Sequence, residues 1–301
     1  MKENSKFKLA LLVLFGIFTF FFFLLLKLPD ARIQNLAIAH IKTVSQNFGI
    51  LFSAEKVRIS LIFGPALKFY NVELKAMDDD TQTLKIEFLK IKPKFFSMLT
   101  STKKAAFSAE LLDGEVSGVI GASVSDASNS ALITHLYFDS INLSHATLLK
   151  KFIPVQFGSG QLDGKIKLNL DFSQTQKSRG SENIIVKDLS LLSQKIYGFN
   201  VPKINMSQAQ IEFTISEGSL LIDKIEMGKD QKTDDIVAKV IGDGQIGQSL
   251  EKTKINFKII FGFSEALKQS FPLLDNILTP AKTTDGRYAY KVTGFLFAPG
   301  M

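Results

Sequence analysis

Hydrophobic and polar residues follow three successive patterns along this chain. The first is an apolar run without any charged side chain, from Leu9 to Leu26. As a helix this run is about 27 Å long, which matches the hydrocarbon thickness of a bilayer, and Leu28 extends it. We therefore predict a membrane-spanning helix over residues 9–28, preceded by a cytoplasmic tail of residues 1–8.

Lysines before the apolar run set the expected orientation. Three lysines and a single glutamate precede the run, and positive charge favours the cytoplasmic side of a membrane. We expect a single-pass topology with residues 29–301 on the far side. The alternative is a cleaved signal peptide, since Ala37-Ile38-Ala39 has the small-x-small form of a cleavage site.

The second pattern is helical and the third is that of strands. Apolar residues from Ile33 to Val44 recur at helical spacing, and Gly49 provides a stop. From Phe52 onward apolar and polar residues alternate, which predicts half-buried β-strands. The alternation slips by one residue at Phe88-Leu89, which indicates a bulge or a strand end. Another helix is predicted from residue 264 to residue 278.

One strand shows the alternation most clearly. Its apolar positions are separated by lysine, asparagine and aspartate, so that one face is apolar throughout. We predict that this face lines either a core or an apolar groove. Its residues are Ile166, Leu168, Leu170 and Phe172.

A recurring Asp-Gly unit punctuates the strands. Asp-Gly is favoured where a tight hairpin needs positive φ, so each copy predicts a reversal between two strands of a long antiparallel meander. The residues predicted in hairpin turns are Asp113 and Gly114, Asp163 and Gly164, Asp243 and Gly244, and Asp285 and Gly286, with Glu217-Gly218 as a looser fifth copy. We expect a mainly β domain over residues 29–301, with possible halves 29–120 and 132–301 on either side of a Ser, Ala and Asn-rich stretch.

Composition excludes some classes of partner and of reaction. The formal net charge is +7, but the basic residues are scattered among the strands without a long run, so we expect no nucleic-acid partner. The chain has no cysteine, which excludes disulfides, thiolate nucleophiles and cysteine-bound zinc.

The motifs that resemble cofactor or metal sites each lack a feature that such a site needs. Gly242-x-Gly244-x-x-Gly247 matches a dinucleotide fingerprint, yet a strand rather than a long helix follows it. The three histidines lack the spacing of a metal site, and Asp78-Asp79-Asp80 lacks the alternating ligands of a calcium loop. We expect no enzymatic activity, no metal and no cofactor.

Three segments carry a resemblance to a known family. They are Phe107 to Gly118, Gly160 to Leu168 and Asp285 to Gly294, following the anchor and the short helix. In this order of parts the chain resembles the GspN family of type II secretion system proteins, of the delta-proteobacterial type, and more distantly the AsmA-like envelope proteins. The resemblance covers nearly the whole chain, and its motifs are structural rather than catalytic.

The resemblance implies a location, a fold and two functions. It implies a bacterial inner-membrane protein whose periplasmic domain is an elongated, twisted antiparallel β-sheet, shaped as an AsmA-like groove or half-barrel with a few short helices. The leading function is that of a non-catalytic accessory or scaffold component, with other type II secretion components and the inner-membrane lipid bilayer as partners. The alternative is a periplasmic lipid-binding or lipid-transfer protein, with phospholipid as its ligand.

Overall fold

The computed structural model describes residues 30–60, 64–94, 97, 99–100, 102–123, 131–153, 155–196, 199–271, 278–296 and 298–300. The predicted transmembrane segment, residues 9–28, lies outside this part of the chain. Within the described ranges, no helix combines the length and the apolar character that a bilayer crossing needs. The chain divides into two compact units, Met1–Phe48 and Gly49–Met301.

The first unit contains α2 (Asp30–Asn47), which confirms the helix predicted after the apolar run. Its end follows from local backbone chemistry. The amide of Phe48 donates to the carbonyl of Ser45 at 3.0 Å. Gly49 then adopts a φ of 67°, a conformation that glycine reaches without the steric cost of a Cβ and that commonly terminates helices.

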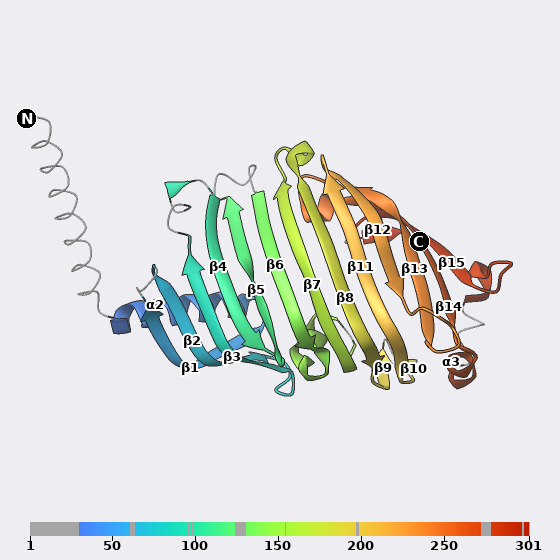
Figure 1. The fold of residues 1–301 in the computed structure, drawn as a ribbon, viewed down its shortest axis with the longest axis horizontal. Helices are drawn as coiled ribbons and strands as arrows, with labels where there is room; N and C mark the ends of the chain where they lie inside the picture. Colours follow the sequence, from blue (N-terminus) through green and yellow to red (C-terminus); the bar gives the residue numbers. More distant parts are fainter. Residues whose placement is uncertain are drawn as a thin grey trace, which may run out of the picture. The chain divides into compact units, whose positions relative to one another are not determined.

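The second unit is built on one large antiparallel sheet (Figure 1). Among the described residues the sheet has fourteen strands, and each pairs with the next strand of the sheet in chain order. They are β1 (Ile50–Ser60), β2 (Ala66–Ala76), β3 (Thr83–Pro93), β4 (Thr102–Leu111), β5 (Gly114–Ser123), β6 (Ala131–Asn142), β7 (Phe157–Asp171), β8 (Arg179–Leu191), β11 (Ile204–Ser216), β12 (Ser219–Met227), β13 (Ile236–Gln245), β14 (Lys254–Phe263), β15 (Tyr288–Phe295) and β16 (Ala298–Gly300). The mainly β antiparallel fold predicted from the alternation is therefore confirmed.

Short elements connect these strands. The strands β9 (Gln194–Ile196) and β10 (Phe199–Val201) form a separate hairpin between β8 and β11. The helix α3 (Glu265–Ser270) starts where it was predicted, because the Ser264 hydroxyl accepts a hydrogen bond from the Leu267 amide at 3.1 Å. It ends at Ser270, and residues 272–277 of the predicted helix lie outside the described residues. The 3₁₀ turns are η2 (Leu143–His145), η3 (Thr147–Lys151), η4 (Thr175–Lys177), η5 (Leu250–Lys252) and η6 (Thr279–Ala281).

The possible division into halves 29–120 and 132–301 does not correspond to a boundary in this sheet. β5 and β6 lie on either side of the Ser, Ala and Asn-rich stretch, yet they are paired neighbours from Glu115 opposite Asp139 to Ala122 opposite Leu132. Because backbone hydrogen bonds continue across this point, residues 49–301 form one body.

Three of the predicted hairpin turns are present. The turn at Asp113 and Gly114 occurs one residue earlier than predicted, with Leu112 and Asp113 at φ values of 52° and 62° and Gly114 opening β5. Glu217-Gly218 connects β11 to β12, with both residues at positive φ. Asp285 and Gly286 form the turn before β15, closed by the bridge between Lys282 and Tyr288.

The other two predicted hairpin turns are wrong. Asp163 and Gly164 lie inside β7, and Asp243 and Gly244 lie near the end of β13. At both places the glycine allows a neighbouring backbone to come close. A Cβ on Gly164 would stand 2.5 Å from the carbonyl oxygen of Asn183, and one on Gly244 would stand 2.7 Å from that of Lys254.

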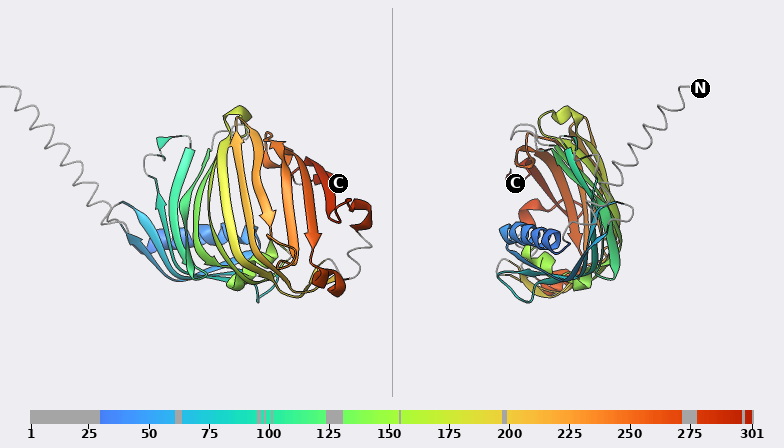
Figure 2. Two further views of the ribbon diagram at one scale, coloured as in Figure 1. Left: turned by 45° about the vertical axis from the view of Figure 1, so that its right-hand side comes forward. Right: turned by 90° about the vertical axis from the view of Figure 1, so that its left-hand side faces the viewer.

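The sheet curves (Figure 2). Its two faces differ in polarity. On β7, Lys165, Lys167 and Asn169 are exposed, whereas Ile166 and Leu168 are half-buried. Neighbouring strands keep this division, because residues paired across an antiparallel ladder project from the same side. We call the two sides the polar face and the apolar face.

A row of irregular positions crosses the sheet, and we call it the bulge row. In the first three strands, Glu55, Asn71 and Glu87 lie at facing positions where regular pairing is interrupted. Further along, Ser140 in β6 and Asp188 in β8 adopt φ values of 56° and 49°, as Asn71 does at 50°. A register shift lies between Ile86 and Phe88, directly before the Phe88-Leu89 position where the sequence predicted a bulge or a strand end.

Polar side chains stabilise the bulge row. The amide nitrogen of Asn71 donates to Glu55, and the backbone amide of Ser140 donates to the Asp163 carboxylate at 2.9 Å. The Ser159 hydroxyl donates to the carbonyl of Asp188 at 2.7 Å. The bonds to Ser140 and Asp188 satisfy backbone groups that the interrupted ladder leaves unpaired, and the bond between Asn71 and Glu55 joins the two side chains across the irregularity.

The bulge row changes which residues share a face. In β2 the buried residues Phe69 and Val72 are three positions apart. In β8 the partly buried Val186 and the buried Leu189 have the same spacing. Without a bulge, residues three apart would project from opposite faces. Each irregular position therefore keeps the apolar residues on both sides of it on a single face.

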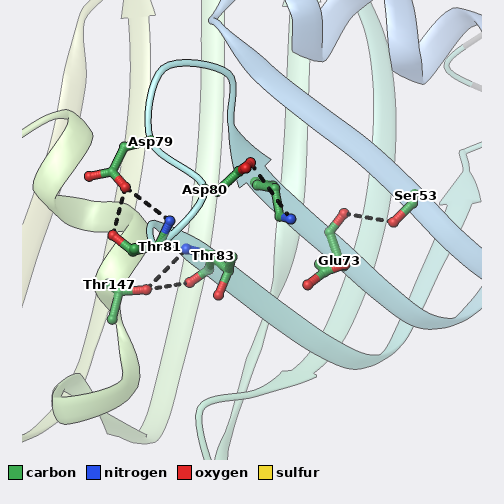
Figure 3. A network of polar contacts seen from close by, with 8 residues as sticks. Ser53, Glu73, Asp79, Asp80, Thr81, Thr83 and Thr147 are labelled. Carbon is green, nitrogen blue, oxygen red and sulfur yellow. Dashed lines mark hydrogen bonds and ion pairs between the residues drawn. The ribbon is translucent and has the colours of Figure 1, made fainter.

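The connection between β6 and β7 is fixed to the start of β3 (Figure 3). The hydroxyl of Thr147 donates to the carbonyl of Thr83 at 2.8 Å and accepts from its amide at 3.0 Å, so this side chain completes the end of the strand. Lys151 forms an ion pair with Asp78 at 2.8 Å. The adjoining turn is closed by Asp79, whose pKa is lowered mainly by hydrogen bonds from Thr81.

Asp234 organises the connection between β12 and β13. This residue is 1% exposed, and its carboxylate accepts hydrogen bonds from the amide of Lys229 at 2.6 Å, the amide of Asp230 at 3.1 Å and the hydroxyl of Ser207 at 3.0 Å. Burial raises the pKa of Asp234, but the hydrogen bonds to its ionised form outweigh burial and lower the pKa below its ordinary value.

We predict that Asp234→Ala lowers the free energy of unfolding by about 2 to 4 kcal/mol, because buried donors lose their charged acceptor. The control is Asp80→Ala, since the side chain of Asp80 is 88% exposed and forms an ion pair with Lys75 at 3.7 Å. Denaturant unfolding of the full chain measures both variants. Equal stability of the two variants would contradict the role assigned to Asp234.

Candidate functional site

The predicted apolar face on β7 joins a buried cluster at one end of the strands. Leu170 is 4% exposed and packs with Ile215 and Ile246. Leu168 and Phe172 contact this cluster as partly buried members, together with Leu132, Phe213 and Leu220. We call this group the small cluster. Three of the four predicted residues therefore contribute to a core, while Ile166 lies outside it.

A second buried cluster lies toward the opposite end of β7 and β11. We call it the large cluster, and it includes the connection between β6 and β7 as well as residues of α3, β14 and β15. Tyr288, at 0% exposure, stacks on Phe261 with ring centroids 5.6 Å apart. The buried residues of the large cluster are Ile141, Leu143, Ala146, Leu189, Ile204, Met206, Ala209, Phe263, Leu267 and Tyr288.

Between the two clusters the apolar face is only half-buried. Two rows of paired residues cross the sheet here, and none of their members belongs to the buried part of either cluster. The first row is Leu136, Ile166, Glu182, Phe213 and Ile222, and the second is Phe138, Gly164, Ile184, Ile211 and Ile225. We call these two rows the middle belt.

One ionisable residue interrupts the middle belt. Glu182 of β8 faces Ile166 on one side and Phe213 on the other. Along β8, the residues on the same face are Gly180 and Ile184. The diagonal positions are held by Gly164, Leu168, Ile211 and Ile215, so the surroundings of Glu182 are apolar or glycine.

No partner for the Glu182 carboxylate appears among the described residues, since neither a hydrogen bond nor an ion pair reaches it. Burial raises the pKa of Glu182 above its ordinary value. Within the fully described strands β5 to β8 and β11 to β15, Glu182 is the single carboxylate on the apolar face. The sequence pattern contains its signal, because Glu182 has the same parity as Gly180, Ile184 and Val186.

Elsewhere among the described residues, clusters of polar groups do not form a recognisable reaction centre. In the described part of the chain, no group of three or more histidine, aspartate or glutamate side chains has a geometry suited to a metal ion. Gly242 and Gly244 of the dinucleotide-like motif lie inside β13, and only the three-residue turn η5 follows them. The middle belt with Glu182 is therefore the candidate site.

Comparisons with known proteins add no identification. No family model, no curated protein and no solved structure matches the chain.

We predict a pH-dependent stability difference between the native chain and Glu182→Gln. Below the ordinary glutamate pKa both side chains are neutral, so the two proteins should melt at similar temperatures near pH 4. As the pH rises to about 7, ionisation of Glu182 costs more in the folded state than in the unfolded state, so the native chain loses stability relative to the variant.

Thermal unfolding of the full chain at both pH values tests this prediction, with Glu251→Gln at an exposed site as control. A melting temperature of Glu182→Gln that exceeds the native value near pH 7, with a gap that closes near pH 4, is the expected result. A gap that is independent of pH would show that burial does not affect this carboxyl.

Proposed function

We propose that this chain is a non-catalytic envelope protein that binds a lipid along the middle belt of its apolar face. The supporting observation is the contrast along β7, β8 and β11, where both ends pack into buried clusters but the apolar middle is only half-buried. Apolar surface gains about 25 cal/mol per Å² when it leaves water, so a hydrocarbon chain would bind favourably there.

The dimensions of the middle belt suit a lipid tail. The belt crosses β6, β7, β8, β11 and β12, which are successive neighbours in the sheet. At a strand spacing of about 4.8 Å, four intervals cover roughly 19 Å. One acyl chain spans about half of a 30 Å bilayer core, or roughly 15 Å, so a tail fits across the strands.

The polar face is consistent with lipid binding on the opposite side of the sheet. Lys165, Lys167 and Asn169 point to the opposite side of β7 and are exposed, so this side of the sheet faces water. The proposal also includes the location and topology expected from the sequence. They are a single-pass inner-membrane location, a cytoplasmic amino end and a periplasmic sheet.

An accessory role in type II secretion is the second candidate function. The small cluster favours it, because Leu168, Leu170 and Phe172 behave there as an ordinary protein core rather than as an open groove. On this hypothesis the sheet is a scaffold that contacts other type II secretion components, and the resemblance to the GspN family supplies the identity of the system.

Lipid binding is tested with two neighbouring isoleucines on opposite faces of β8. Ile184 lies in the middle belt and Ile185 on the polar face, and both are half-buried. We predict that Ile184→Gln lowers the amount of copurifying lipid at least threefold, because covering the polar amide with a hydrocarbon tail removes it from water at a cost in free energy. Ile185→Gln should retain the native amount.

The full chain, purified in nonionic detergent and transferred to amphipol, is extracted and its lipid is quantified by mass spectrometry. The matched pair controls for lipid held by the rest of the chain and for the volume of the substituted side chain. Equal lipid content in the two variants would exclude the middle belt as the binding surface.

The secretion role is tested separately by deleting the gene in its native host. The scaffold hypothesis predicts a reduced amount of exported enzymes in the medium, restored by the native chain and by Ile184→Gln alike. Normal export after deletion would eliminate this second candidate, and a loss of envelope integrity in the same strain would support lipid binding.

A further inference from the structure

Glu182 places a carboxylate where the sheet otherwise presents hydrocarbon. The side chains that flank it across the strands, Ile166 and Phe213, are apolar, and the neighbours along β8 on the same face are Gly180 and Ile184. The diagonal positions are also apolar or glycine. No residue of the described chain supplies a hydrogen-bond donor or a cation to it.

This environment restricts which ligands could complement the carboxylate. An ionised carboxylate that is partly removed from water gains most from a cationic hydrogen-bond donor, since charge-assisted bonds strengthen as the local dielectric falls. A bound metal ion would need further oxygen or nitrogen ligands, and no suitable group is present among the described residues. A ligand with an ammonium group meets the requirement with one contact.

The surroundings of Glu182 also define the rest of the ligand. Atoms next to the ammonium group would lie against Ile166, Phe213 and Ile184, so they must be hydrocarbon rather than polar. A ligand with both features is an amphiphile in which a positively charged nitrogen is attached to an aliphatic chain.

We propose that Glu182 binds the ammonium group of an amine-bearing amphiphile whose hydrocarbon chain lies along the middle belt. This inference rests on the proposed lipid-binding function and adds the class of ligand that the belt selects. The contact gives the belt a preference for one head group, because an anionic head would be repelled by the carboxylate and a neutral head would leave its charge uncompensated.

The test uses three probes with the same hydrocarbon chain, namely dodecylammonium, dodecanol and dodecyl sulfate. Binding to the full chain held in amphipol is measured by titration calorimetry near neutral pH, with empty amphipol as the blank. We expect dodecylammonium to bind at least about tenfold more tightly than dodecanol, and dodecyl sulfate to bind more weakly than both.

Two variants separate the head-group contact from the tail contact. Glu182→Gln should reduce the preference for dodecylammonium over dodecanol to less than about twofold and should still bind dodecanol. Ile184→Gln should weaken binding of all three probes and preserve the order among them.

Each result has a distinct meaning. Equal binding of dodecylammonium and dodecanol by the native chain, or an unchanged preference in Glu182→Gln, would overturn the ammonium site while leaving lipid binding intact. Absence of binding by every probe would overturn the proposed lipid-binding function itself. Retained affinity for dodecanol in Glu182→Gln also shows that the variant is folded, so a lost preference cannot come from unfolding.

Discussion

Backbone pairing between successive strands is the constraint on which the second unit depends. Each interior strand of the sheet needs partners on both sides, and these partners are its neighbours in chain order apart from the detour through β9 and β10. An irregularity in one strand must therefore be accommodated by the next, which explains why Glu55, Asn71 and Glu87 lie at facing positions. Pairing thus converts single bulges into a row across the sheet.

This row and the two clusters together create the candidate site. Since the bulges keep apolar residues such as Val186 and Leu189 on one side, the large cluster forms at one end of the strands without turning the apolar face outward. The small cluster around Leu170 forms at the other end. The middle belt stays half-buried because β7, β8 and β11 are longer than the two clusters at their ends together cover.

Sequence periodicity predicted the faces well and the turns less well. Alternation over Ile166, Leu168 and Leu170 depends on a local geometric rule, and the structure follows it. Asp-Gly has several structural uses, so the motif at Gly164 could not be distinguished from a hairpin until the closely approaching β8 backbone was known. Membership of the small cluster could not be predicted either, because Ile246 reaches Leu170 through pairings that no local pattern encodes.

Glu182 was overlooked for a related reason. Catalytic sites usually contain several polar residues together, whereas this site consists of one carboxylate among apolar positions. Local preference and global fold disagree at Glu182, since a glutamate of this parity projects from the apolar face of β8. Residues that conflict with their surroundings in this way often serve function rather than stability. Replacing Glu182 by an apolar residue would remove the conflict but also the only charge that could orient an amphiphile within this part of the described sheet.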